Sequence, residues 1–354
     1  MATRIAFLLC WVGLLANLSY GFASSSLPTS PFVASKSASS TVLSASTAST
    51  SGWKPKIESL EDRRSLRNQA YDSEIIGTKS FHHVEFYCGD ARSTANHFCL
   101  SLGMSITGTT SQATGNDQCV SYALESEDNF KLLLTAPYSR ARASADEGGN
   151  DNDEEYDAPL SLPNFDVEGA HNFFQKHGLA ARAVGVEVKD AKAAFEASVA
   201  NGAVPVLEPS FLPTCPAQLR DDNNNNDGGC YIAEVELYGD VVLRYVSFPE
   251  TGNADSDASS GSSTLTQPFL PHLAPVETST LRESYGIFRI DHAVGNVHDL
   301  QEAYSRIQGF TGFHEFAEFT SEDVGTVDSG LNSVVLASDS EEVLLPLNEP
   351  TSGR

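Results

Sequence analysis

Two histidines stand at the same place in two similar runs of residues, and a strand histidine can bind a metal ion. His83 lies seven residues before Asp90, and His292 lies seven residues before Asp299. A strand fixes the direction of its side chains, which suits a metal ligand, and neutral imidazole binds transition metals. The alternative for each histidine is a hydrogen-bonded residue of the core.

The cysteines indicate no metal or disulfide framework. The six are Cys10, Cys88, Cys99, Cys119, Cys215 and Cys230. They are scattered without CxxC spacing, which gives neither a zinc-ribbon pattern nor a disulfide scaffold. We therefore interpret them as free thiols of a protein in a reducing compartment.

The elements that must position the two histidines have the same order. Residues 80–90 are rich in aromatic side chains and predict a strand. A helix is predicted over 91–102, with apolar residues at helical spacing and Gly103 after it. Strands are predicted next at 120–124 and 130–136.

The same order returns at the end of the chain and, in a diverged copy, between the two. The last copy predicts a strand from 288, a helix at 300–307 closed by Gly309, and strands at 312–319, 331–338 and 342–347. The middle copy predicts a strand at 183–188, a helix at 191–200, and strands at 230–237 and 240–248. An Asp at 90, 190 or 299 can cap the helix of its copy. The repeated strand–helix–strands plan predicts an α+β fold built from similar modules.

Length and charge restrict the classes of protein further. The 354 residues suggest two domains plus unfolded segments, and a hydrophobic content of 40% can form sizeable cores. The formal net charge is -25, from 47 acidic and 22 basic residues. That balance excludes a nucleic-acid-binding protein that binds phosphates through basic side chains. It also excludes attraction to anionic membranes through positive charge.

The first 50 residues predict a routing signal. They contain no Asp or Glu, and an apolar run at 5–15 follows Arg4. That run is too short to span a bilayer and is typical of a signal-peptide core. A Ser/Thr-rich stretch of transit-peptide type follows Phe22, so we expect a two-part plastid-targeting leader. The alternative is a secretory signal followed by a flexible linker.

The rest of the chain divides by composition. We predict a polar segment at 51–78 with a short helix near 57–68, a two-module domain at 79–250, a linker at 251–280, and a further module at 281–354. Polar and acidic stretches at 145–157, 221–229 and 251–266 cannot bury a core face, so they are interpreted as surface loops or linkers.

Several long runs resemble one enzyme family in order along the chain. They are residues 79–86, 237–246, 289–296, 309–319 and 329–338. They resemble the 4-hydroxyphenylpyruvate dioxygenases, most closely the plant and algal type. The resemblance implies paired βαβββ modules of the vicinal-oxygen-chelate fold and a non-haem Fe(II) enzyme. Such an enzyme converts 4-hydroxyphenylpyruvate and O2 to homogentisate and CO2, a step of tyrosine catabolism that supplies plastoquinone and tocopherol precursors.

The resemblance also implies roles for single residues. His292, in the Asp-His-Ala-Val-Gly-Asn run, matches the family's first iron ligand. The family's substrate-contacting positions correspond to Ser333, Asn348, Pro346 and Val294. From the residues alone, Asn348 before Glu349-Pro350 equally fits a turn.

The two-module domain at 79–250 differs from the family's catalytic half. Arg244 lies about where that half carries its Glu ligand, and a cation there opposes Fe(II). We therefore expect His83 to be structural and the first domain to be non-catalytic.

The resemblance supplies only one of the family's three iron ligands. The family's second His and its Glu lie beyond the match to Asn348, and the chain ends at Arg354. We expect three of the family's four modules here, in a truncated and inactive version of the enzyme. The alternatives are a non-catalytic binding protein of the same fold, or an enzyme like 4-hydroxymandelate synthase. The expected partners are substrate and O2, with no nucleic acid and no stable membrane span, and a homo-oligomer is allowed.

Overall fold

The computed structural model describes residues 72–138, 162–214, 229–249, 268–277, 284–316 and 331–350, together with the backbone of β1 (Ile5–Leu9). The remainder of the predicted leader, the helix predicted near 57–68 and nearly all of the three polar stretches lie outside the described residues. No helix in the described ranges is long and apolar enough to cross a bilayer.

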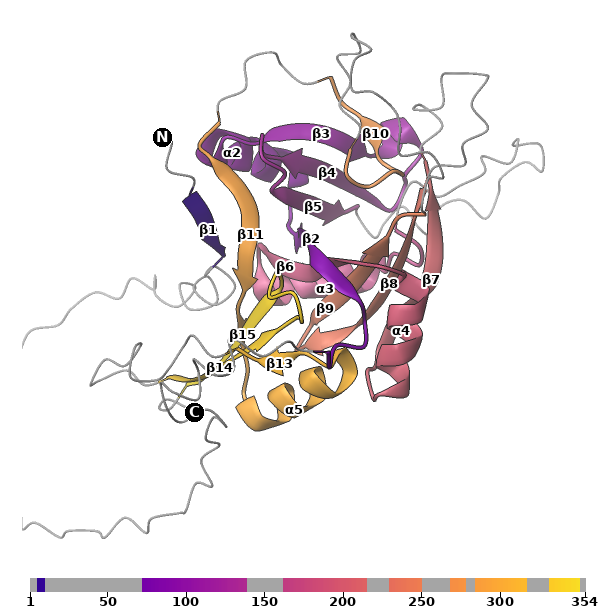
Figure 1. Ribbon diagram of the computed structural model, residues 1–354. Helices are drawn as coiled ribbons and strands as arrows, with labels where there is room; N and C mark the ends of the chain where they lie inside the picture. The colour runs from indigo at the N-terminus through magenta and orange to yellow at the C-terminus, as the bar shows by residue number, and fades with distance from the viewer. Residues whose placement is uncertain are drawn as a thin grey trace, which may run out of the picture.

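A curved nine-stranded sheet forms the larger part of the molecule (Figure 1). Its strand order is β10-β3-β4-β5-β2-β6-β9-β8-β7. At its centre, β2 (Thr78–Tyr87) pairs antiparallel with β6 (Ala180–Val188). Each central strand then pairs in parallel with the last strand of its own copy, β5 (Lys131–Pro137) or β9 (Val241–Ser247). The two halves of the sheet therefore repeat one arrangement, which we name the first and second modules.

The outer strands complete these two modules. They are β3 (Ser105–Thr110), β4 (Cys119–Glu125), β7 (Pro205–Pro213) and β8 (Gly229–Tyr238). Neither β3 nor β7 was predicted. Three prolines in β7 argue against a strand by sequence, and β7 tolerates them because it lies at the edge of the sheet.

Each predicted helix of the sheet is present and capped as expected. The helix α2 (Ala91–Leu102) packs on β4 and β5, and α4 (Ala191–Ala200) packs on β8 and β9. Asp90 and Asp190 cap them by accepting bonds from backbone N–H groups of their first turns. An unpredicted helix, α3 (Val167–His177), packs against β2 and β5.

The third module repeats the order with a smaller, four-stranded sheet. It comprises β11 (Ile287–Ala293), β12 (Gly295–Asn296), α5 (Leu300–Thr311), β13 (His314–Glu315), β14 (Leu331–Ala337) and β15 (Leu344–Pro350). The strand β12 pairs with β15, β15 with β14, and β14 with β13.

The predicted end of the third-module helix was wrong. Gly309 lies inside α5, and the helix ends instead at Gly312, which has φ 73°. The extra turn is stabilised because Phe310 and Thr311 are fully buried. The strand predicted at 312–319 is short where described, since β13 covers only His314–Glu315.

One hydrophobic core joins the second and third modules. Val184, Leu243 and Phe195 of the second module share it with Phe310 and Leu345 of the third. The helices α4 and α5 lie in contact across this core. The apolar face of α5 is therefore covered from both sides.

Two segments outside the modules are also paired. Within the predicted linker, residues 268–277 pack on the nine-stranded sheet through Phe269, Leu270 and Leu273, and β10 (Ala274–Pro275) pairs with β3. Within the predicted leader, β1 pairs in parallel with β11, with a register shift at each step. The domain boundaries themselves stay predictions.

Candidate functional site

The third module carries the predicted substrate-contacting residues on one face of its sheet. The strands β14 and β15 place Ser333 opposite Asn348, with Pro346 two residues before Asn348. Val334 and Leu347 point into the core under α5. Because side chains alternate along a strand, Ser333, Pro346 and Asn348 point to the face away from α5.

His292 belongs to the same arrangement. Its neighbour Ala293 lies in the core with α5, so alternation directs His292 to the opposite side. Val294 follows at the break between β11 and β12, and β12 then pairs in parallel with β15, placing Asn296 opposite Asn348. The structure thus brings together the segments that bear all the predicted site residues, whose roles stay predictions.

The contacts of His292 suit a metal ligand. Its side chain is 12% exposed, and its Nδ1 lies 2.8 Å from Oδ2 of Asp291. A carboxylate that accepts the Nδ1–H bond favours the tautomer in which Nε2 keeps its lone pair, as found behind metal-binding histidines. Asp291 is itself held by Arg289 at 3.1 Å. His292 therefore fits one ligand position, while the described residues contain no group of three or more ligand-type side chains.

Asn348 lies inside β15, so the alternative interpretation of a turn was wrong. The Ser333 hydroxyl donates to Oδ1 of Asn348 at 2.7 Å, and the Asn348 carbonyl accepts from Val297 N at 2.8 Å. The bond from Ser333 orients the amide, so that its NH2 group can donate to an oxygen of a ligand on the open face.

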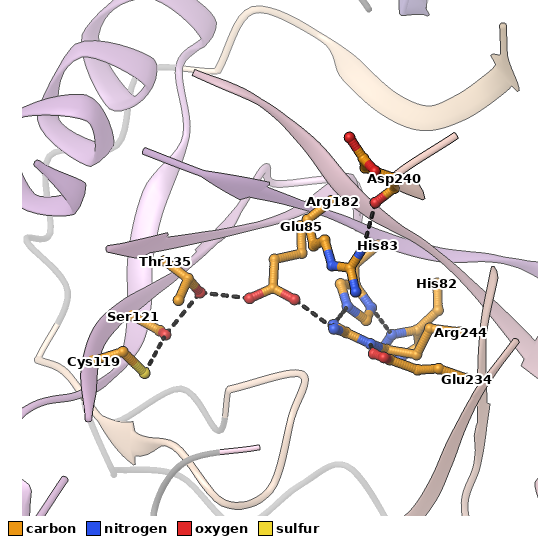
Figure 2. Close-up of polar contacts among 10 residues, drawn as sticks. All are labelled: His82, His83, Glu85, Cys119, Ser121, Thr135, Arg182, Glu234, Asp240 and Arg244. Carbon is orange, nitrogen blue, oxygen red and sulfur yellow. Dashed lines mark hydrogen bonds and ion pairs between the residues drawn. The ribbon is translucent and has the colours of Figure 1, made fainter. Parts of the chain in front are cut away.

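A second polar cluster lies on the nine-stranded sheet, around Arg244 (Figure 2). The Arg244 side chain is 1% exposed. Its Nη2 lies 2.5 Å from Glu85 Oε2, and its Nε lies 2.7 Å from Glu234 Oε1. Its Nη1 lies 3.0 Å from Nε2 of His83. Two carboxylates and one imidazole thus surround the guanidinium on its three sides, as buried charges require.

Hydrogen bonds extend this cluster in both directions along the sheet. Glu85 Oε1 accepts from the Thr135 hydroxyl at 2.5 Å, and Thr135 contacts the Ser121 hydroxyl at 2.8 Å. On the other side, Nδ1 of His83 lies 2.8 Å from Nδ1 of His82. Figure 2 shows these contacts as one chain that crosses β4, β5, β2 and β9.

The tautomer of His83 follows from its neighbours. Burial, then the nearby His82 and Arg244, lower the pKa of His83 well below its usual value, so the ring is neutral. Because the guanidinium can only donate, Nε2 of His83 must accept, and Nδ1–H then donates to His82. The Nε2 lone pair that a metal would need is used by Arg244, which supports a structural role for His83.

Sequence reasoning placed Arg244 but missed its partners. Glu85 and Glu234 stand in otherwise apolar strands, within Val84-Glu85-Phe86 and Ala233-Glu234-Val235. A carboxylate buried on a strand requires a cation or a set of donors, which was the available signal.

Comparisons with known proteins identify relatives of this chain. No family model matches the chain. The 4-hydroxyphenylpyruvate dioxygenase of Daucus carota is 45% identical over 283 residues, which cover 79% of this chain and 55% of that protein. The enzyme of the same name from Arabidopsis thaliana is 44% identical over 282 residues, 79% of this chain and 56% of the relative.

A solved structure supports the fold. A mutant 4-hydroxymandelate synthase from Streptomyces coelicolor superposes with a TM-score of 0.51 at 15% identity, over 78% of this chain and 64% of that one. At such identity the likeness concerns the fold alone. The chain spans about half the length of the curated relatives it matches. Over 79% of its own length, the chain is homologous to the 4-hydroxyphenylpyruvate dioxygenases, and it has the vicinal-oxygen-chelate fold.

Proposed function

We propose that the protein containing this chain is an Fe(II)-dependent 4-hydroxyphenylpyruvate dioxygenase. It converts 4-hydroxyphenylpyruvate and O2 to homogentisate and CO2. The observation that carries the proposal is the common face of Ser333, Pro346 and Asn348 beside the strand of His292, in a chain 45% identical to an enzyme of that name.

In this proposal, His292 holds the metal through Nε2, and Asp291 keeps the imidazole in the required tautomer. The other iron ligands come from outside the described residues. A bound Fe(II) supplies the redox chemistry by which a 2-oxo acid reacts with O2. The Asn348 amide, oriented by Ser333, donates to an oxygen of the substrate, while Pro346 and Val294 provide apolar walls that limit water.

The test is His292→Ala in the protein with its complete catalytic half. We expect O2 uptake and homogentisate formation to be abolished, with Fe(II) and ascorbate present, because a ligand to the metal is lost. His97→Ala is the matched control, since His97 is exposed on α2. Full turnover by the His292→Ala variant would overturn the proposal. Chromatography of the product distinguishes homogentisate from 4-hydroxymandelate, the product expected of a synthase.

We also propose that residues 1–50 direct the protein to a plastid. The abrupt change from an apolar run to a Ser/Thr-rich, acid-free stretch after Phe22 supports this proposal. A fluorescent reporter fused behind residues 1–55 is expected inside the plastid. A secreted reporter would contradict it.

A further inference from the structure

Two segments next to the nine-stranded sheet contact α5, one at its C-terminal end and one near its middle. Its C-terminal end contacts residues 73–76, which immediately precede β2 and which we name the strap. Its middle, through Arg306, and the preceding strand β12 contact the end of β8 and the turn into β9, Leu237-Tyr238-Gly239-Asp240, which we name the strut. Both segments lie far from the third module in sequence.

The strap satisfies carbonyl groups that the end of α5 leaves without helical partners. Ile75 N donates to the Thr311 carbonyl at 3.0 Å, and the Ser73 hydroxyl donates to the Gly312 carbonyl at 2.9 Å. A reciprocal pair of bonds then reaches the turn between β14 and β15. Glu74 N donates to Asp339 Oδ2 at 3.3 Å, and Asp339 N donates to Glu74 Oε2 at 3.0 Å.

The strap fits its seat closely. A Cβ on Gly312 would lie 3.0 Å from the Glu74 Cα and would collide with the Ser73 carbonyl oxygen. Ile76 is 3% exposed and lies in the core shared by the second and third modules. The second carboxylate oxygen of Glu74 accepts from Thr78 N, at the start of β2. Glu74 therefore links the central strand of the large sheet to the third module directly.

The strut fits against β12 and the middle of α5 with a similar closeness. A Cβ on Gly295 would lie 2.6 Å from the Tyr238 ring. Arg306 of α5 donates to the Leu237 carbonyl at 2.6 Å, and its guanidinium lies 3.6 Å from the Glu236 carboxylate. Tyr238 itself is 7% exposed and belongs to the shared core.

From these contacts we infer that Glu74 of the strap and Tyr238 of the strut are positioning residues for the proposed site. Gly295 begins β12, three residues after His292, so the strut fixes the backbone directly after the strand of the proposed iron ligand. Asp339 begins the turn into β15, so the strap fixes the strand of Asn348. The inference rests on the proposed function, because the strands that are aligned carry His292 and Asn348 of the proposed site.

If Glu74 contributed only to the overall stability of the protein, its loss would affect all three modules alike. The Glu74 contacts are hydrogen bonds at one end of α5, while the shared core lies beneath the helix. Losing them should therefore loosen the third module and leave the first module intact. Glu74→Gln keeps one oxygen that can accept from Asp339 N, but its NH2 group cannot accept from Thr78 N, so it should restore only part of what Glu74→Ala loses.

Hydrogen–deuterium exchange of the 354-residue protein tests the inference without any need for activity. In Glu74→Ala, amides of 300–311 and 331–350 should exchange about tenfold faster, while those of β4 and β5 stay unchanged. Glu74→Gln should show exchange between that of Glu74→Ala and that of the unsubstituted protein. Glu127→Ala is the matched control, since Glu127 is exposed in the turn after β4. Unchanged exchange in the third module, or an equal rise in all modules, would overturn the inference.

A glycine pair gives a second, independent measurement at the strut. Gly295→Ala should speed exchange in β12 and β15, because the new methyl group displaces Tyr238. Gly309→Ala is its control, since a Cβ there meets only the Asn201 carbonyl oxygen at 3.9 Å. Equal exchange in the two variants would count against a role for the strut.

Kinetics in the protein with its complete catalytic half separate positioning from substrate binding. We expect Glu74→Ala to lower kcat about tenfold with KM changed less than about twofold, since misaligned reacting groups slow the chemical step more than binding. Glu74→Gln should recover part of kcat. A change in KM alone would refute positioning. If the unsubstituted enzyme makes no homogentisate, the proposed function fails, while the exchange result still decides whether the strap holds the third module.

Discussion

Arg244 Nη1 lies 3.0 Å from Nε2 of His83, the ring nitrogen that would have to be free for a metal. In the third module, His292 at the matching position contacts a carboxylate through Nδ1 instead, at 2.8 Å from Asp291. Equivalent histidines of two modules thus have different partners. The Nε2 lone pair of His83 accepts from Arg244, whereas Nε2 of His292 keeps its lone pair available for a metal.

The guanidinium should be essential to the nine-stranded sheet, because it joins carboxylates of the first and second modules. We expect Arg244→Leu to lower the free energy of unfolding by about 3–5 kcal/mol, because Glu85 and Glu234 would remain buried without a counter-charge. Urea unfolding followed by circular dichroism measures the change. Arg289→Leu is the matched control, because the Arg289 side chain is 42% exposed and should contribute less than about 1 kcal/mol. Equal losses in the two variants would contradict the argument.

Buried neutral histidines should make the fold sensitive to mild acid. Burial lowers the pKa of His82 and His83 well below the usual value, and lowers the pKa of His272 to about 3. The unfolded chain takes up protons near pH 6.5 while the folded chain does not, so stability is present above that pH and falls as the pH drops. The slope is at most about 1.4 kcal/mol per pH unit for each histidine.

Urea unfolding at pH 7.5 and 5.5 measures this effect, in a range above the usual pKa values of carboxylates. We expect lower stability at pH 5.5. His272→Phe should reduce the difference in free energy of unfolding between the two pH values by the contribution of one histidine. A phenyl ring fits a buried site and cannot be protonated. Stability that is equal or higher at pH 5.5 would refute the prediction.

The corrected end of α5 gives a prediction with opposite signs at two glycines. Gly309 is exposed inside the helix, so Gly309→Ala should stabilise the protein by about 0.5–1 kcal/mol. Gly312 has φ 73° and adjoins the strap, so Gly312→Ala should destabilise by at least about 1 kcal/mol. Thermal unfolding compares the two. Destabilisation by Gly309→Ala would contradict a helical Gly309 and would favour the helix end that was predicted from sequence.

Local patterns predicted local structure well. The helices at 91–102 and 191–200 and their Asp caps follow from spacing and side-chain chemistry within one turn, and the structure confirms them. The helix end at Gly309 was wrong because the buried Phe310 lies in a core made with another module, which sequence spacing does not reveal. Tertiary burial decided that position.

The candidate site, too, was only partly predictable from the sequence. The common face of Ser333 and Asn348 follows from strand alternation once the register is known, and the register required the structure. Glu234 is the cross-strand partner of Arg244 in the β8–β9 hairpin, so this pair follows from the two strands predicted at 230–237 and 240–248. Glu85 lies on β2, far from Arg244 in sequence, and no local pattern pairs those two residues. The packing of residues 268–277 was also unexpected, because a linker of similar composition need not fold on a sheet.

The carboxylate behind His292 should control metal affinity. Asp291→Asn removes the charge that favours an Nδ1–H tautomer, and its amide NH2 can donate to Nδ1 and so favour the wrong tautomer. We expect Fe(II) affinity to fall about 10–100-fold in the protein with its complete ligand set, as is typical when a group behind a metal ligand is lost. Titration with Fe(II) under anaerobic conditions measures the dissociation constant directly. Asp299→Asn is the matched control, because Asn caps a helix about as well as Asp and residue 299 faces the first turn of α5. Unchanged affinity in Asp291→Asn would mean that the imidazole is oriented by another group, and equal losses in both variants would mean that a general loss of negative charge is responsible.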